Sequence, residues 1–139
     1  MTSFLDRSRE RDAHIDQRLR ENVIAWLTSV RPDGRPHAVA VWFLWDGNSF
    51  LIFSRPKNQK LYNIQRNSNV LLIVDDSHRG SDPIVIEGKA TLLAPGEVDA
   101  TTAGFVEKYR ERIKSLGYTP EQMAAAYSEG IRIVPTRVL

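Results

Sequence analysis

Short apolar runs separated by turn-forming residues recur along the chain and predict a mostly β protein. Three of these runs, at 23–30, 37–45 and 49–54, are joined by the segments RPDGRP and DGN. Proline, glycine, asparagine and aspartate in such segments favour tight turns. Because short connections between consecutive strands are typical of an antiparallel meander, we expect the chain to form three antiparallel strands here.

Three further apolar runs complete the expected sheet. Residues 70–74 are apolar without interruption, which is typical of a buried strand. Residues 84–92 alternate in part, and Gly88 within them favours a bulge or bend. The last run, 131–138, contains Pro135, which a strand tolerates at an edge or a bulge. The pattern therefore predicts six strands.

Helical periodicity appears between these runs. Thr119 and Gln122 flank Pro120 with the spacing of a capping box, so a helix should begin there, and Gly130 should end it. Apolar residues with helical spacing predict three other helices, at 13–21, 58–66 and 97–114.

One domain is expected to span residues 1–139, since this length is ordinary for a single hydrophobic core. Within it, residues 1–21 form a helical lead-in, and residues 97–128 form a helical insertion before the last strand.

Several expected strands are apolar on both faces, as 37–45 and 70–74 illustrate. A meander with one face in water would not tolerate this pattern, so both faces must be covered. The interior of a small barrel covers one face, and a second subunit can cover the other. We therefore expect a homodimer.

Composition and charge exclude several classes of function. The chain has no cysteine, so disulfides and thiolate chemistry are absent, and a reducing compartment such as the cytoplasm is expected. No apolar run approaches the length of a membrane span or a signal peptide, and a net charge of +2 does not indicate a nucleic-acid partner. The five arginines within 6–21 are balanced by five acidic residues, as on a solvated helix.

Candidate chemistry lies in a stretch without acidic residues between Asp46 and Asp75. Arg55, Lys57 and Lys60 lie inside this gap, where an expected strand ends and an expected helix begins. A guanidinium fork, ammonium charges and the free N–H groups of a helix start are all groups that bind phosphate. Ser54 could add a hydroxyl. The segment 54–60 therefore indicates a site for a phosphate-bearing small molecule, although such cations can also merely solvate a loop.

Four segments in this order and spacing resemble the pyridoxamine-phosphate-oxidase-like split β-barrels, which bind flavin mononucleotide (FMN) or the deazaflavin coenzyme F420. They are 24–30 (IAWLTSV), 33–43 (DGRPHAVAVWF), 54–64 (SRPKNQKLYNI) and 86–90 (IEGKA). The segments HIDQRL at 14–19 and WFLWDG at 42–47 are most similar to the short F420-dependent group.

This resemblance implies a six-stranded antiparallel split β-barrel with peripheral helices, FMN-binding-like and homodimeric. It also implies a cofactor site at the subunit interface, with F420 as the cofactor and FMN as the alternative. Its ring would lie against the strand at 37–43, with backbone from Val39 to Val41 at its polar edge. The residues that would bind the cofactor are Val39, Ala40, Val41, Ser54, Arg55, Lys57 and Lys60.

A flavin or deazaflavin carries the hydride itself, so the protein need supply only binding, orientation and a dry pocket. We accordingly expect no catalytic side chain and no metal site. His14, His37 and His78 are too scattered for a metal constellation, and His37 is interpreted as a packing residue. The leading hypothesis is an F420-dependent reductase acting on a small, conjugated substrate. The alternatives are an FMN oxidoreductase, a cofactor-binding protein without turnover, and a barrel that binds no cofactor.

Overall fold

The computed structural model describes residues 4–139, so the first three residues of the expected lead-in lie outside the described part. Its centre is one antiparallel sheet in the order β2-β1-β5-β6-β7-β4-β3. The strands are β1 (Ala25–Val30), β2 (Pro36–Val41), β3 (Leu44–Trp45), β4 (Phe50–Ser54), β5 (Asn69–Val74), β6 (Ile84–Leu92) and β7 (Glu129–Val138). The helices are α1 (Glu10–Glu21), α2 (Gln59–Arg66), α3 (Ala103–Ser115) and α4 (Pro120–Ala126).

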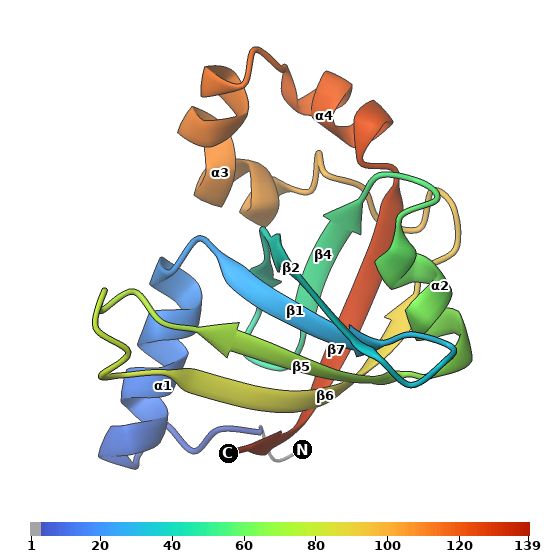
Figure 1. Cartoon of the computed structure of the whole chain (residues 1–139). Helices are drawn as coiled ribbons and strands as arrows, with labels where there is room; N and C mark the ends of the chain where they lie inside the picture. Colours follow the sequence, from blue (N-terminus) through green and yellow to red (C-terminus); the bar gives the residue numbers. More distant parts are fainter. Residues whose placement is uncertain (1–3) are drawn as a thin grey trace.

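The sheet curls into a split barrel because its two edge strands are neighbours in sequence. Only Trp42 and Phe43 separate β2 from β3, which lie at opposite ends of the strand order. This short connection brings the two edges of the sheet together (Figure 1). The expected mostly β architecture is confirmed.

The structure has seven strands where six were expected, because the expected strand at 37–45 is broken. At the break, the backbone N–H of Phe43 donates to the Tyr109 hydroxyl at 2.8 Å, and its carbonyl accepts from the Lys108 ammonium at 2.7 Å. Side chains of α3 therefore satisfy polar backbone groups that would otherwise bond to a neighbouring strand. The prediction of one continuous strand was wrong because these partners lie 65 and 66 residues further along the chain.

Two helices cover the barrel on opposite sides (Figure 1). On α1, Ile15 and Leu19 are buried, and Asp16 accepts a hydrogen bond from the indole of Trp45 at 2.9 Å. On α2, the Asn63 amide donates to the Ser29 hydroxyl of β1 at 3.0 Å. These contacts join both helices to the strands that surround the interior core.

The remaining two helices lie together at one end of the molecule (Figure 1). With the outward-facing side chains of β4, they form a second apolar cluster that includes Phe53, Phe105 and Tyr109. The helix α4 begins with the capping box expected at Thr119 and Gln122, which is confirmed. The predicted helix 97–114 begins only at Ala103.

The end of the insertion also differs from the prediction. Gly130 does not end α4, which stops at Ala126. Gly130 lies in β7 and pairs with Phe53.

Within residues 4–139, no helix has both the length and the apolar character needed to cross a membrane.

The bulge expected at Gly88 is confirmed, since the register of β6 against β7 shifts between Glu87 and Gly88. A Cβ atom at Gly88 would lie 2.7 Å from Ile133 Cγ2 and 3.0 Å from the Val134 carbonyl oxygen. Glycine therefore permits the close approach of the two strands at this bend.

Candidate functional site

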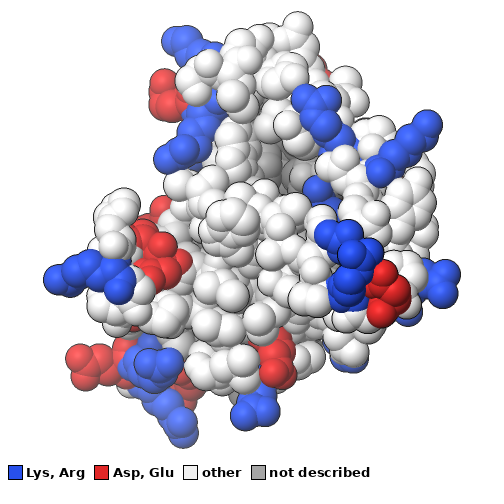
Figure 2. Space-filling view, viewed as in Figure 1, with Lys and Arg blue, Asp and Glu red and all other residues white. Residues whose placement is uncertain are grey.

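A cavity of about 350 Å³ lies between the barrel and the α3–α4 insertion. Figure 2 shows this face of the molecule hollowed beneath the two helices, with uncharged walls and blue cationic side chains near its right-hand rim. The volume is within the usual range for a small-molecule site. The cavity is lined by Ala40, Val41, Trp42, Phe53, Lys60, Ala100, Phe105, Leu116, Met123 and Tyr127.

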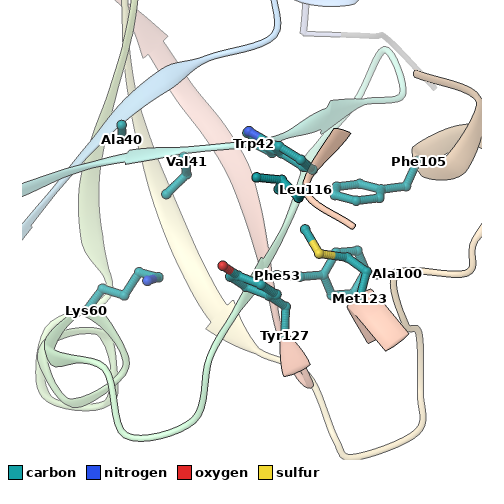
Figure 3. A pocket seen from close by; sticks show the side chains of 10 residues that line it. All are labelled: Ala40, Val41, Trp42, Phe53, Lys60, Ala100, Phe105, Leu116, Met123 and Tyr127. Carbon is teal, nitrogen blue, oxygen red and sulfur yellow. The ribbon is translucent and has the colours of Figure 1, made fainter. Parts of the chain in front are cut away.

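Lys60 is the cation that faces this cavity. Its side chain enters from α2, and its nitrogen points toward the cavity centre (Figure 3). The residue is only 8% exposed, and no hydrogen bond or ion pair within residues 4–139 involves its ammonium group. Burial lowers the pKa of Lys60. A buried ammonium without a counter-charge favours an anionic ligand, because pairing recovers part of the cost of desolvation.

The other residues expected to bind phosphate lie outside the cavity lining. The Arg55 guanidinium is 4.7 Å from the ring centre of Tyr127 and donates to the Tyr118 hydroxyl at 3.3 Å. Since Tyr127 lines the cavity, Arg55 lies beside the cavity without facing it.

Ser54 and Lys57 are also placed differently from Lys60. Ser54 is 1% exposed, and its hydroxyl donates to the Arg55 carbonyl at 2.8 Å. Lys57 is exposed, in the turn before α2, with a left-handed φ of 67°. The structure thus separates one enclosed cation from two exposed ones.

Two of the three expected residues of β2 lie at the cavity. Ala40 and Val41 line it, and Val41 also belongs to the interior core, against which the half-buried Val39 packs. Of the seven sequence-predicted residues, the structure therefore brings Ala40, Val41 and Lys60 together at one cavity.

Trp42 forms an aromatic wall of the cavity and is held by α3. Its ring stacks on that of Tyr109, with centroids 4.6 Å apart and planes 2° from parallel. The Tyr109 hydroxyl donates to the carbonyl oxygen of Val23 at 2.8 Å or that of Phe43 at 3.0 Å. Burial raises the pKa of Tyr109, so this hydroxyl stays protonated.

Sequence reasoning named three of the ten lining residues, and half of the lining comes from the insertion. Phe105 points into the cavity from α3, and Met123 and Tyr127 approach it from α4 and its end (Figure 3). Their apolar spacing on helices was visible in the sequence. It predicted packing but could not indicate which side chains would border a cavity.

The arrangement can bind a molecule that has an apolar, flat part and one anionic group. Aromatic walls suit a conjugated ring, and Lys60 lies at one side of the same cavity. Within residues 4–139, no group of histidine, aspartate and glutamate side chains has the arrangement of a metal site. The lining includes no histidine, aspartate or glutamate that could transfer a proton.

Comparisons with known proteins agree with this architecture. Residues 12–139 match the family model described as pyridoxamine 5'-phosphate oxidase. A structure titled putative pyridoxamine 5'-phosphate oxidase, from Listeria innocua, is 25% identical with a TM-score of 0.70, and the match covers 94% of this chain and 97% of that one. No curated protein matches the chain.

Two other solved structures have the same fold and different titles. One titled F420 reductase is 26% identical with a TM-score of 0.65, over 89% of this chain and 94% of that one. A heme storage protein from Vibrio cholerae is 12% identical with a TM-score of 0.64, over 90% of this chain and 89% of that one. The second similarity concerns the fold alone.

Proposed function

Because the chain belongs to the pyridoxamine 5'-phosphate oxidase family, we propose that it binds a phosphate-bearing flavin or deazaflavin and acts as an oxidoreductase. The proposed cofactor is F420, with hydride transfer to a small, conjugated substrate. The observation that carries the proposal is the buried, unpartnered ammonium of Lys60 inside a cavity with aromatic walls.

The residues present fit such a cofactor. Lys60 would bind its phosphate through a charge-assisted hydrogen bond, and Arg55 and Lys57 would add positive potential nearby. Phe53 and Trp42 supply apolar surface for the ring and exclude water from it. The bound cofactor would supply the hydride chemistry, so the chain itself needs only to bind the cofactor, orient it and exclude water from it.

The choice of F420 over FMN rests on similarity. The segments HIDQRL and WFLWDG resemble F420-dependent proteins, and the structure titled F420 reductase is 26% identical. FMN is the alternative cofactor, because a phosphate and a tricyclic ring are common to both. A protein that binds the cofactor without turnover is the second alternative, since no histidine, aspartate or glutamate lines the cavity.

We also propose that the partner of this chain is a second copy of itself. Trp26 on β1 is 52% exposed and pairs with Ala40 on one side and Ile73 on the other. Covering this apolar outer face would stabilise the protein. Since Ala40 also lines the cavity, a second subunit on this face would border the cofactor site. Neither nucleic acid nor a membrane is proposed as a partner.

Spectroscopic titration tests the proposal. Purified protein would be titrated with F420, FMN and heme, with absorbance and fluorescence as readouts. Tight binding of F420, followed by its oxidation in single-turnover mixing with quinones or nitro-compounds, is the expected result. Preference for FMN would change the cofactor, and binding without turnover would indicate a carrier. Binding of heme alone would overturn the proposal.

A further inference from the structure

Tyr127 brings a phenol hydroxyl into the cavity from the end of α4. Among the lining residues that the structure describes, Lys60 and Tyr127 are the two that carry an ionisable group. The tyrosine hydroxyl points into the cavity, toward the side from which the Lys60 nitrogen enters (Figure 3). Because the proposed function assigns Lys60 to the phosphate, Tyr127 is the lining residue that remains to hold or move a proton.

The position of Tyr127 is fixed by the insertion. Its backbone N–H donates to the Met123 carbonyl at 2.8 Å and so caps the end of α4. Its half-buried ring packs against the second apolar cluster, to which Met123 also belongs. The hydroxyl is therefore held at the cavity before any ligand arrives, which lowers the entropic cost of meeting a substrate atom.

Arg55 places positive charge beside the same phenol. The central carbon of its guanidinium lies 4.7 Å from the ring centre of Tyr127. The pKa of Arg55 is raised, first by hydrogen bonding to the Tyr127 hydroxyl and then by hydrogen bonding to Tyr118. The ammonium of Lys60 faces the same cavity. A phenol that gives up its proton becomes an anion, and nearby positive charges stabilise that anion.

We propose that Tyr127 is the proton donor of the reaction: its hydroxyl binds the carbonyl oxygen of a conjugated substrate, such as an enone or a quinone, and gives it a proton. The inference rests on the proposed function, which it extends from the cofactor to the substrate. The rest of the lining fits such a molecule, because Phe105 and Met123 offer apolar surface to its conjugated body.

A two-electron reduction with Tyr127 as the acid balances in atoms and electrons. A hydride, supplied by the reduced flavin or deazaflavin, adds to one end of the conjugated system of the substrate. An electron pair of that system moves to the carbonyl oxygen at the other end. This oxygen takes the proton of the Tyr127 hydroxyl as the O–H bond of the tyrosine breaks, and the phenolate regains a proton from water. The product is an enol or a hydroquinone.

The first test is spectroscopic and needs no turnover. The full chain is saturated with oxidised F420 or FMN, whichever binds, and menadione labelled with ¹³C at its carbonyl groups is added. A hydrogen bond from Tyr127 should lower the stretching frequency of one carbonyl in infrared difference spectra. In Tyr127→Phe this shift should be lost, and menadione should bind about two- to tenfold more weakly, at unchanged cofactor affinity.

The second test measures turnover with the reduced cofactor. Tyr127→Phe should lower kcat for menadione by about 100-fold, while KM changes by less than about tenfold. Tyr118→Phe is the matched control, because the Tyr118 hydroxyl contacts the same guanidinium at 3.3 Å but Tyr118 is not among the lining residues. It should change kcat by less than about twofold. Circular dichroism confirms that both variants fold.

Failure of Tyr127 as the donor and failure of the proposed function give different results. Equal kcat in wild type and Tyr127→Phe, or a carbonyl shift that persists in Tyr127→Phe, would overturn the inference and leave the proposed function intact. Equal losses in Tyr127→Phe and Tyr118→Phe would do the same, since they would assign the effect to Arg55.

Reduction of nitro-compounds but not of menadione by the wild type would also overturn the inference alone, because the substrate would then not be a carbonyl compound. Wild-type protein that binds neither cofactor, or that binds one and reduces neither menadione nor nitro-compounds, would overturn the proposed function and the inference with it.

Discussion

The ring of Tyr109 lies parallel to that of Trp42, with their centroids 4.6 Å apart. The hydroxyl of the same tyrosine accepts the backbone N–H of Phe43 at 2.8 Å. One residue of α3 therefore stabilises both the break between β2 and β3 and the aromatic wall of the cavity. The insertion is structurally coupled to the site it covers.

Removing the hydroxyl of Tyr109 should destabilise the protein. Tyr109→Phe keeps the ring but leaves the N–H of Phe43 without its acceptor, so the free energy of unfolding should fall by about 1–3 kcal/mol. Urea denaturation measures the change. Tyr118→Phe is the matched control, because its hydroxyl accepts only a 3.3 Å bond from the exposed Arg55. Equal effects of the two variants would mean that the hydrogen bond at the break contributes no special stability.

Lys60 and Lys57 should contribute unequally to cofactor binding. Lys60→Met should weaken binding of F420 or FMN by about tenfold or more, because a charge-assisted contact to phosphate is lost within the cavity. Lys57→Met should have a smaller effect, since Lys57 is exposed and its charge is screened by water. Fluorescence titration measures both affinities. A larger loss in Lys57→Met would place the phosphate at the exposed turn instead.

Lys108 should make stability depend on pH in the alkaline range. Burial lowers its pKa from 10.5 to about 8, so the native state releases this proton at a lower pH than the unfolded state. Below about pH 8 the lysine is charged in both states. Between about 8 and 10.5 the unfolded state binds more protons, so stability rises with pH.

Comparison with a variant isolates this contribution. Between pH 7 and pH 9.5, wild-type protein should gain about 2 kcal/mol in the free energy of unfolding relative to Lys108→Met. Lys114→Met removes an exposed lysine of the same helix, and its free energy of unfolding should depend on pH as that of the wild type does. Parallel pH profiles for wild type and Lys108→Met would show that Lys108 titrates normally.

The outer face of the sheet should mediate self-association. Wild-type protein is expected to be a dimer in light scattering at micromolar concentration, and Trp26→Glu should shift it to the monomer by introducing a charge into an apolar interface. Tyr62→Glu is the control, because Tyr62 is similarly exposed, at 50%, but belongs to α2 and not to the sheet. A monomeric wild type, or dissociation by both variants, would contradict the proposed interface.

Local features of the fold could be predicted because their causes are local. The capping box at Thr119 and Gln122 needs only residues three apart, and the bulge at Gly88 needs a residue without a side chain. The strand break at Phe43 could not be predicted in the same way. Its hydrogen-bond partners lie in α3, so nothing in the residues around Phe43 distinguishes them from a continuing strand.

The candidate site could be predicted only in part. The gap without acidic residues located a cationic segment, but Arg55, Lys57 and Lys60 were equivalent within it. Burial distinguishes the three cations, because Lys60 is buried and lines the cavity, whereas Arg55 and Lys57 are exposed. Burial depends on which elements cover a residue, and sequence spacing does not specify this.

By itself, the sequence determined that the chain is mostly β, that its helices interrupt the sheet, and that positive charge gathers between Asp46 and Asp75. Those properties follow from the identity and order of neighbouring residues. The tertiary structure alone decided that the α3–α4 insertion covers a cavity and that Tyr127 and Lys60 line it together. Contacts between distant segments depend on how the whole sheet curls, and the curl is set by packing throughout the barrel.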